Sequence, residues 1–116
     1  MKNQTFRMTM LFDFYGELLT DKQREYFDLH YNEDLSLAEI AALTGISRQG
    51  VWDIIKRAEA TLKEIEAKTG LVARFAARRE ALADIENRLS ALLDSPDAAA
   101  RRISREVIDA LRGLDD

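Results

Sequence analysis

Seven side chains between residues 47 and 57 have the clearest capacity for molecular recognition in this chain. Arg48 and Gln49 could hydrogen-bond base edges, because arginine pairs with guanine and glutamine with adenine in the DNA major groove. Lys56 and Arg57 could bind phosphate oxygens. We predict that these side chains form one surface that binds nucleic acid or another partner: Ser47, Arg48, Gln49, Trp52, Asp53, Lys56 and Arg57.

Two of these residues argue against DNA as the partner. Asp53 would repel phosphates, and Trp52 is bulky and apolar where a DNA-reading helix more often has a small or polar side chain. Trp52 itself allows two interpretations. It packs beneath the C-terminal helices as part of the core, or it anchors a protein partner, since tryptophan is enriched at interface hot spots.

The sequence contains no arrangement typical of an enzyme. It has no glycine-rich phosphate loop and no nucleophile paired with a histidine, and His30 is the only histidine. The absence of cysteine excludes a thiolate metal site. We therefore predict a protein without catalytic activity, cofactor or metal.

The charge balance is also unfavourable for a nucleic-acid binder. The net charge is −4 over 116 residues, whereas binding of phosphates requires positive charge. Residues 36–63 carry four basic and three acidic side chains and form the only positive segment. The acidic series in residues 13–28 is either a solvated face or a surface for a basic partner. No apolar run is long enough to cross a bilayer and no signal peptide is evident, so we expect a cytoplasmic protein.

Helical periodicity places the seven recognition residues in a helix-turn-helix over residues 36–57. Leu37, Ile40, Ala41 and Leu43 form a first apolar stripe, and Ile46, Val51, Ile54 and Ile55 form a second. Gly45 between the stripes permits a tight corner. Ser36 with Glu39 forms a capping box, and Ser47 is a suitable N-cap for the second helix, which we place at residues 47–62.

The remaining sequence predicts an all-α protein with two parts. Residues 1–62 supply four helices; the first buries a face made of Phe6, Met10, Leu11, Phe14, Tyr15, Leu18 and Leu19, and the second begins after a Thr20 cap. Thr69-Gly70 is a stop signal, so we divide the chain into a helix-turn-helix bundle at 1–69 and a helical hairpin at 70–116. Ser95 is the expected N-cap of the last helix, with Pro96 at its first position.

The hairpin carries a heptad-like apolar seam. Its members are spaced by three and four residues, with Arg78 as the one interruption: Leu71, Phe75, Leu82, Ile85, Leu89 and Leu92. Such a seam is typical of helices that pair with each other or with a second chain. We predict a homodimer formed through residues 71–93.

Segments of the first 57 residues resemble two known families. Leu19–Phe27, Ser36–Ala41 and Gly45–Arg48 are similar to region 4 of bacterial sigma-70-type factors. A closer likeness, over about residues 5–70, is to the small bacterial YlxM family of helix-turn-helix proteins. It rests on Leu11–Tyr15, Leu18–Thr20, Lys22–Arg24, Ser47–Asp53 and Ile55–Arg57. Members of that family usually have alanine where this chain has Gly50.

The resemblance implies a function that the residues alone do not. The YlxM family is linked, mainly by gene neighbourhood, to the signal recognition particle GTPase and its receptor. We therefore expect a regulatory or accessory protein of co-translational targeting that binds the particle's protein or RNA. The alternative is a transcription regulator that reads duplex DNA with the 47–62 helix; sigma-type readers, however, tend to have lysine or a small polar residue where Trp52 and Asp53 stand.

Overall fold

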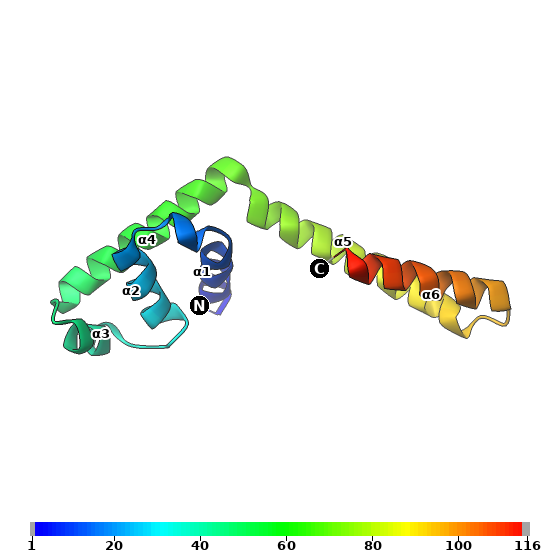
Figure 1. Ribbon diagram of the computed structural model, residues 1–116, viewed down its shortest axis with the longest axis horizontal. Coiled ribbons are helices and arrows are strands. Elements are labelled where there is room, and N and C mark those ends of the chain that lie inside the picture. The colour runs from blue at the N-terminus through cyan, green and yellow to red at the C-terminus, as the bar shows by residue number, and fades with distance from the viewer. Residues whose placement is uncertain (1, 115–116) are drawn as a thin grey trace. The chain divides into compact units, whose positions relative to one another are not determined.

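The computed structural model describes residues 2–114, with side chains from residue 4 onward. These residues form six α-helices and two short 3-10 turns, with no strand in the described range, which confirms the all-α prediction (Figure 1). The contacts divide the chain into two compact units, residues 1–72 and residues 73–116. In the range that the structure describes, no helix is long and apolar enough to span a membrane.

The N-terminal unit is built around its longest helix. It contains α1 (Lys2–Tyr15), the turn η1 (Gly16–Leu18), α2 (Asp21–Tyr31), α3 (Leu37–Thr44) and α4 (Arg48–Thr69). Helices α1, α2 and α3 all pack on α4 (Figure 1). The core has two adjoining clusters, whose buried members are Met8, Leu11, Tyr15, Leu19, Phe27, Ala58 and Leu62 in one and Tyr26, Ile40, Val51 and Ile55 in the other.

Local signals for helix ends in this unit are confirmed. Thr20 and Ser36 each form a complete capping box, with Gln23 and Glu39 respectively. The Ser47 hydroxyl accepts a hydrogen bond from the Gly50 amide (3.0 Å) and caps α4. Gly45, at φ 78°, ends α3 in the left-handed conformation that glycine adopts without steric cost. The corner of the helix-turn-helix is therefore the one that the sequence indicates.

The prediction that the second helix of the motif ends at residue 62 is wrong. Helix α4 continues to Thr69 and is capped by Gly70 at φ 63°. Its last turn is attached to α1, because the Tyr15 hydroxyl lies 2.6 Å from both Glu66 Oε1 and Thr69 Oγ1. These tertiary hydrogen bonds stabilise the last turns of α4. The residues of these turns are mostly polar, so apolar periodicity alone does not identify them as helical.

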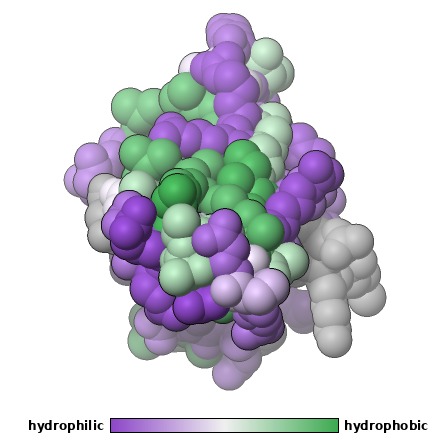
Figure 2. All heavy atoms as spheres, turned by 90° about the vertical axis from the view of Figure 1, so that its right-hand side faces the viewer, coloured by the Kyte–Doolittle hydropathy of each residue, from purple (hydrophilic) through white to green (hydrophobic). Residues whose placement is uncertain are grey.

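Several residues assigned to buried faces are exposed instead. Phe6 and Leu18 are each 68% exposed, and Phe14 and Leu43 also lie at the surface. The buried stripe of α1 is Met8, Leu11 and Tyr15, at spacings of three and four. Because each residue rotates the helix by about 100°, Phe6 and Phe14 fall outside that stripe. In the view of Figure 2, from the side on which the hairpin turn lies in Figure 1, hydrophobic side chains are also exposed among hydrophilic ones.

The second unit is an antiparallel hairpin of two helices (Figure 1). It contains most of α5 (Leu71–Ser90), the turn η2 (Ala91–Asp94) and α6 (Ala98–Gly113). The prediction of Ser95 as the N-cap of the last helix is wrong, because Asp97 occupies that position and accepts a hydrogen bond from the Ala99 amide (2.9 Å). A carboxylate at a helix N-terminus interacts favourably with the helix dipole as well as with the free amide.

Candidate binding surface

The seven predicted recognition residues all lie on the exposed side of the N-terminal half of α4. Every one of them is exposed, whereas Val51 and Ile55 on the opposite side of the helix are buried in the core. The hydroxyl of Ser47 is already used as the α4 cap. The structure thus brings the set together on one surface, with Ser47 in a structural role.

Trp52 is the main apolar feature of this surface. Its side chain is 44% exposed, so it is not a member of the core. Together with Leu37, Arg48 and Gln49 it lines a shallow hollow of about 430 Å³ between α3 and α4. Lys56 Nζ lies 5.7 Å from the centroid of the indole ring, within the range of a cation–π interaction. Because tryptophan is enriched at interface hot spots, the exposed Trp52 makes this surface the candidate binding surface.

Asp53 and Gln49 are engaged with each other. The Gln49 amide donates a hydrogen bond to Asp53 Oδ1 (3.1 Å) one helical turn away. This contact uses an amide donor that bidentate pairing with adenine would require. The Asp53 carboxylate is exposed in the middle of the surface, next to Trp52 in the sequence.

A buried carboxylate lies behind Lys56 and was not identified from the sequence. Glu59 is only 5% exposed; it accepts hydrogen bonds from the Tyr31 hydroxyl (2.6 Å) and from Lys56 Nζ (3.2 Å). Burial and the adjacent Glu59 carboxylate raise the pKa of Tyr31. Glu59 therefore connects a core tyrosine on α2 to the cation that lies over Trp52. One sequence signal was available: Glu59 falls on the stripe of Ile55 and Leu62.

Close packing at the helix-turn-helix corner accounts for Gly50. A Cβ atom at this position would lie 2.7 Å from Ile46 Cγ2 and 3.2 Å from the Ser47 hydroxyl oxygen. The first distance is shorter than real Cβ contacts, and Ile46 is a branched side chain held between α3 and α4. Glycine lets the first turn of α4 approach the corner closely.

The predicted dimer seam is divided by the structure. Leu82 and Leu89 are half-buried, whereas Leu71, Phe75, Ile85 and Leu92 are exposed. Leu71 belongs to the N-terminal unit and the other five to the hairpin.

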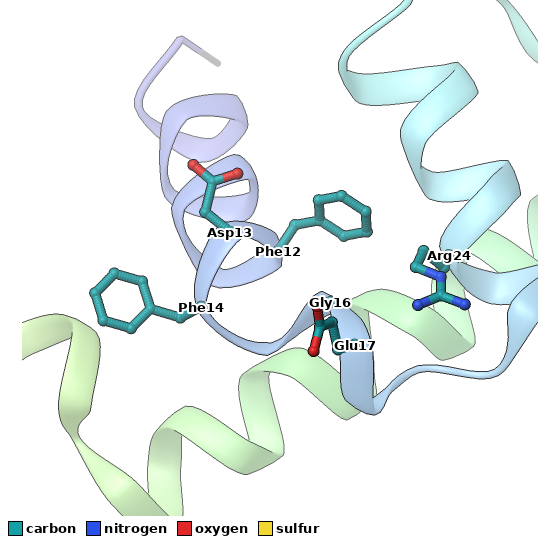
Figure 3. Close-up of a pocket in the computed structure, with 6 residues that line it drawn as sticks. All are labelled: Phe12, Asp13, Phe14, Gly16, Glu17 and Arg24. Carbon is teal, nitrogen blue, oxygen red and sulfur yellow. The ribbon is translucent and has the colours of Figure 1, made fainter.

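A second hollow, of about 490 Å³, lies beside α1 and is shown in Figure 3. The Phe12 ring points toward α2, where it stacks on Phe27, while Phe14 and Asp13 point away from Arg24 (Figure 3). Arg24 already forms an ion pair with Asp21 (2.8 Å). Because its polar groups do not converge, this hollow is less suited to a ligand than the Trp52 hollow. Within residues 2–114 no cluster of His, Asp or Glu could hold a metal ion.

Comparison with known proteins agrees with the helix-turn-helix geometry. Residues 2–99 match the family described as "UPF0122: Putative helix-turn-helix protein, YlxM / p13 like". A UPF0122 protein of Halalkalibacterium halodurans is 47% identical over 106 residues, which cover 84% of this chain and 97% of that protein. A UPF0122 protein of Bacillus cereus is 43% identical over 115 residues, 99% of this chain and 100% of the relative. The chain belongs to the UPF0122 (YlxM/p13-like) family of helix-turn-helix proteins.

Proposed function

We propose that this protein is a non-catalytic accessory or regulatory module of the signal recognition particle pathway. In this proposal, the Trp52 surface of the helix-turn-helix binds the particle's protein or its RNA. The observation that carries the proposal is the 44% exposure of Trp52 on the helix that reads DNA in other helix-turn-helix proteins. The link to the pathway comes from the family resemblance.

The surface chemistry favours a protein or a structured RNA over duplex DNA. An indole ring offers a large apolar area for a partner side chain or a stacking platform for an unpaired base. The Asp53 carboxylate repels continuous phosphate backbones, and it occupies the Gln49 amide. Arg48, Lys56 and Arg57 at the edge of the surface supply positive charge for a carboxylate or phosphate.

The second candidate is a transcription regulator that reads duplex DNA with α4. Arg48 and Gln49 favour it, because both are exposed at the N-terminal end of that helix, which enters the major groove in related motifs. Such binding through about four phosphates would weaken with a log–log salt slope near −3.6, at about −0.9 per phosphate.

One binding comparison separates the two candidates. Trp52 is the sole tryptophan, so its fluorescence reports contacts at this surface. We expect titration with the targeting GTPase or its RNA to change that fluorescence at physiological salt, and duplex DNA to leave it unchanged. Trp52→Ala, followed by partner-side anisotropy, should weaken the complex at least tenfold, whereas Leu43→Ala on α3, also an exposed apolar residue, should not. DNA binding with the slope above and no complex with the GTPase or RNA would overturn the proposal.

A further inference from the structure

The hairpin has an apolar face that its own two helices do not cover. Among residues 73–114 only Ser104 and Ile108 are buried. Exposed apolar side chains occur along both arms of the hairpin, at Ile85 on α5, Leu92 in η2, Ile103 and Val107 on α6, and Leu114 at the C-cap of α6.

These five residues lie on the same side of the hairpin. The sides on which the helices face each other are marked by Leu82 and Leu89 on α5 and by Ser104 and Ile108 on α6, all at least half-buried. From the facing sides, Ile85 is displaced by roughly 50° around α5, and Ile103 and Val107 by roughly 100° around α6, in the same rotational sense, at about 100° per residue. When two antiparallel helices face each other, the same rotational sense on both helices leads to the same side of the pair. The displaced residues of both helices therefore lie on one side of the hairpin. We name the set Ile85, Leu92, Ile103, Val107 and Leu114 the open face.

The opposite side of the hairpin has a different composition. The residues displaced by a similar angle in the other direction are small or polar: Ala76, Arg79, Ala83, Asn87 and Ser90 on α5, and Arg101, Arg105 and Arg112 on α6. Arg112 of this side forms an exposed ion pair with Glu86 (2.6 Å). One side thus suits water and the other suits apolar contact, as in a helix pair that is half of a bundle.

We propose that the open face binds the open face of a second copy of this chain, so that two hairpins form a four-helix bundle. This inference is independent of the proposed function. Three observations favour a second copy as the occupant.

The first observation is the small core of the hairpin, since two buried side chains in a unit of about 40 residues are too few for independent stability. The second is charge. Residues 73–116 carry eight basic and nine acidic side chains, so two copies do not repel, whereas the N-terminal unit carries nine basic and twelve acidic ones. The third is that both helices contribute apolar rows to one side, which suits a twofold, self-complementary contact.

This surface differs from the seam that the sequence suggests. Leu82 and Leu89 are half-buried within one chain, so changing them is expected to disrupt the hairpin itself. Ile85 and Val107 are exposed and report on the contact between copies alone.

The test is the mass of the full chain in sedimentation equilibrium over a micromolar concentration series. We expect the wild type to sediment at twice the 13.2 kDa chain mass. Ile85→Glu with Val107→Glu should sediment at the single-chain mass with helical circular dichroism retained. Ala76→Glu with Ala83→Glu, which adds the same charge on the opposite side, should remain a dimer. A monomeric wild type, or a dimer disrupted by the Ala76/Ala83 changes and not by the Ile85/Val107 changes, would overturn the proposal.

A second variant keeps the test decisive if the glutamate variant unfolds. Val107 lies near the centre of the open face, and the chain has no cysteine. Under mild oxidation we expect Val107→Cys to form a covalent dimer and Ala83→Cys to remain a single chain. Equal cross-linking of both variants, or cross-linking of Ala83→Cys alone, would contradict the proposal.

Discussion

The two units of this protein bury their apolar side chains to very different degrees. In the N-terminal unit, eleven buried apolar residues form two clusters around α4, and aromatic rings stack inside them, with Phe27 between Phe12 (4.6 Å) and Tyr31 (4.4 Å). In the hairpin, Ile108 is the one buried apolar residue in the range that the structure describes. The hairpin helices are joined by an exposed ion pair, Glu86–Arg112.

This difference indicates how each unit obtains its stability. The N-terminal unit has the core of an independent domain, so its outer surface is free to vary for recognition, and Trp52 and Lys56 lie on that surface. The hairpin has helix-forming sequence and good caps but little core. Helices with little buried apolar surface gain most of their stability when an apolar face is covered, which is the role that we propose for the open face.

The largest effect should come from truncating the centre of the N-terminal core. Phe27→Ala removes a fully buried ring that stacks on two others, and we expect a loss of about 3–5 kcal/mol in unfolding free energy. Trp52 fluorescence reports this unit alone, so its unfolding midpoint should fall sharply. Ile108→Ala should leave that midpoint unchanged while it reduces the helical signal of the hairpin. Equal shifts in both variants would show that the two units unfold as one.

The buried Glu59 should be the next most sensitive feature. Tyr31→Phe removes the hydroxyl that donates to Glu59 Oε2, and an unsatisfied buried carboxylate oxygen should cost about 1–3 kcal/mol. Lys56→Met removes a half-exposed cation and should cost less, about 1 kcal/mol at most. Arg112→Met in the hairpin should cost similarly little, because that ion pair is exposed. Denaturant midpoints of the three variants would test this order.

Tyr31 also makes the stability of the N-terminal unit decrease at alkaline pH. The pKa of Tyr31 is raised by burial and by Glu59, so its stabilising contribution is complete below the unfolded pKa of about 10 and is lost as pH rises above it. The difference in stability between wild type and Tyr31→Phe should therefore shrink above about pH 10. A difference that stays constant from neutral to alkaline pH would contradict this assignment.

Gly50→Ala should also destabilise the N-terminal unit, although alanine favours a helix by about 1 kcal/mol over glycine. The methyl group would lie 2.7 Å from Ile46 Cγ2, and Ile46 has little room to move in the corner. In an Ile46→Ala background the clash with Ile46 Cγ2 is absent and only the 3.2 Å contact with the Ser47 hydroxyl oxygen remains, so the same change should be much less destabilising. Melting temperatures of the four chains in this cycle would measure the coupling; stabilisation in both backgrounds would rule out the packing explanation.

The sequence predicted features that depend on a few neighbouring residues. The caps at Thr20, Ser36 and Ser47 and the corner at Gly45 act within one helical turn, and all are present. The recognition residues on α4 share one exposed surface for the same reason, since helical periodicity alone separates them from Val51 and Ile55.

Features that depend on distant parts of the chain were missed. The attachment of the last turn of α4 to Tyr15, more than fifty residues away, and the hydrogen bond between Tyr31 and the buried Glu59 are two such features, whereas the Thr69-Gly70 stop signal correctly marks where α4 ends. Leu43 and Phe6 are apolar and yet exposed, because hydrophobicity does not specify which side of a helix meets its neighbours. In the hairpin, the spacing of apolar residues on α5 does not show which of them α6 covers. Only the residues that α6 leaves exposed are available for the contact that we propose with a second copy.

The smallest expected effect concerns the capping box at the start of α3 in the N-terminal unit. In α3 the Glu39 carboxylate accepts a hydrogen bond from the Ser36 amide (2.9 Å), which lowers the pKa of Glu39. A lowered folded pKa means that this stabilisation is present above the unfolded value of about 4.3 and is lost as pH falls through the folded pKa. Glu39→Gln keeps an acceptor without a titrating charge, so its stability should depend less on acid pH than that of the wild type. Trp52 fluorescence unfolding at neutral and acid pH would measure this, because it follows the N-terminal unit irrespective of the hairpin. Identical pH dependence in both chains would mean that the charge of Glu39 contributes nothing to the stability of the helix-turn-helix.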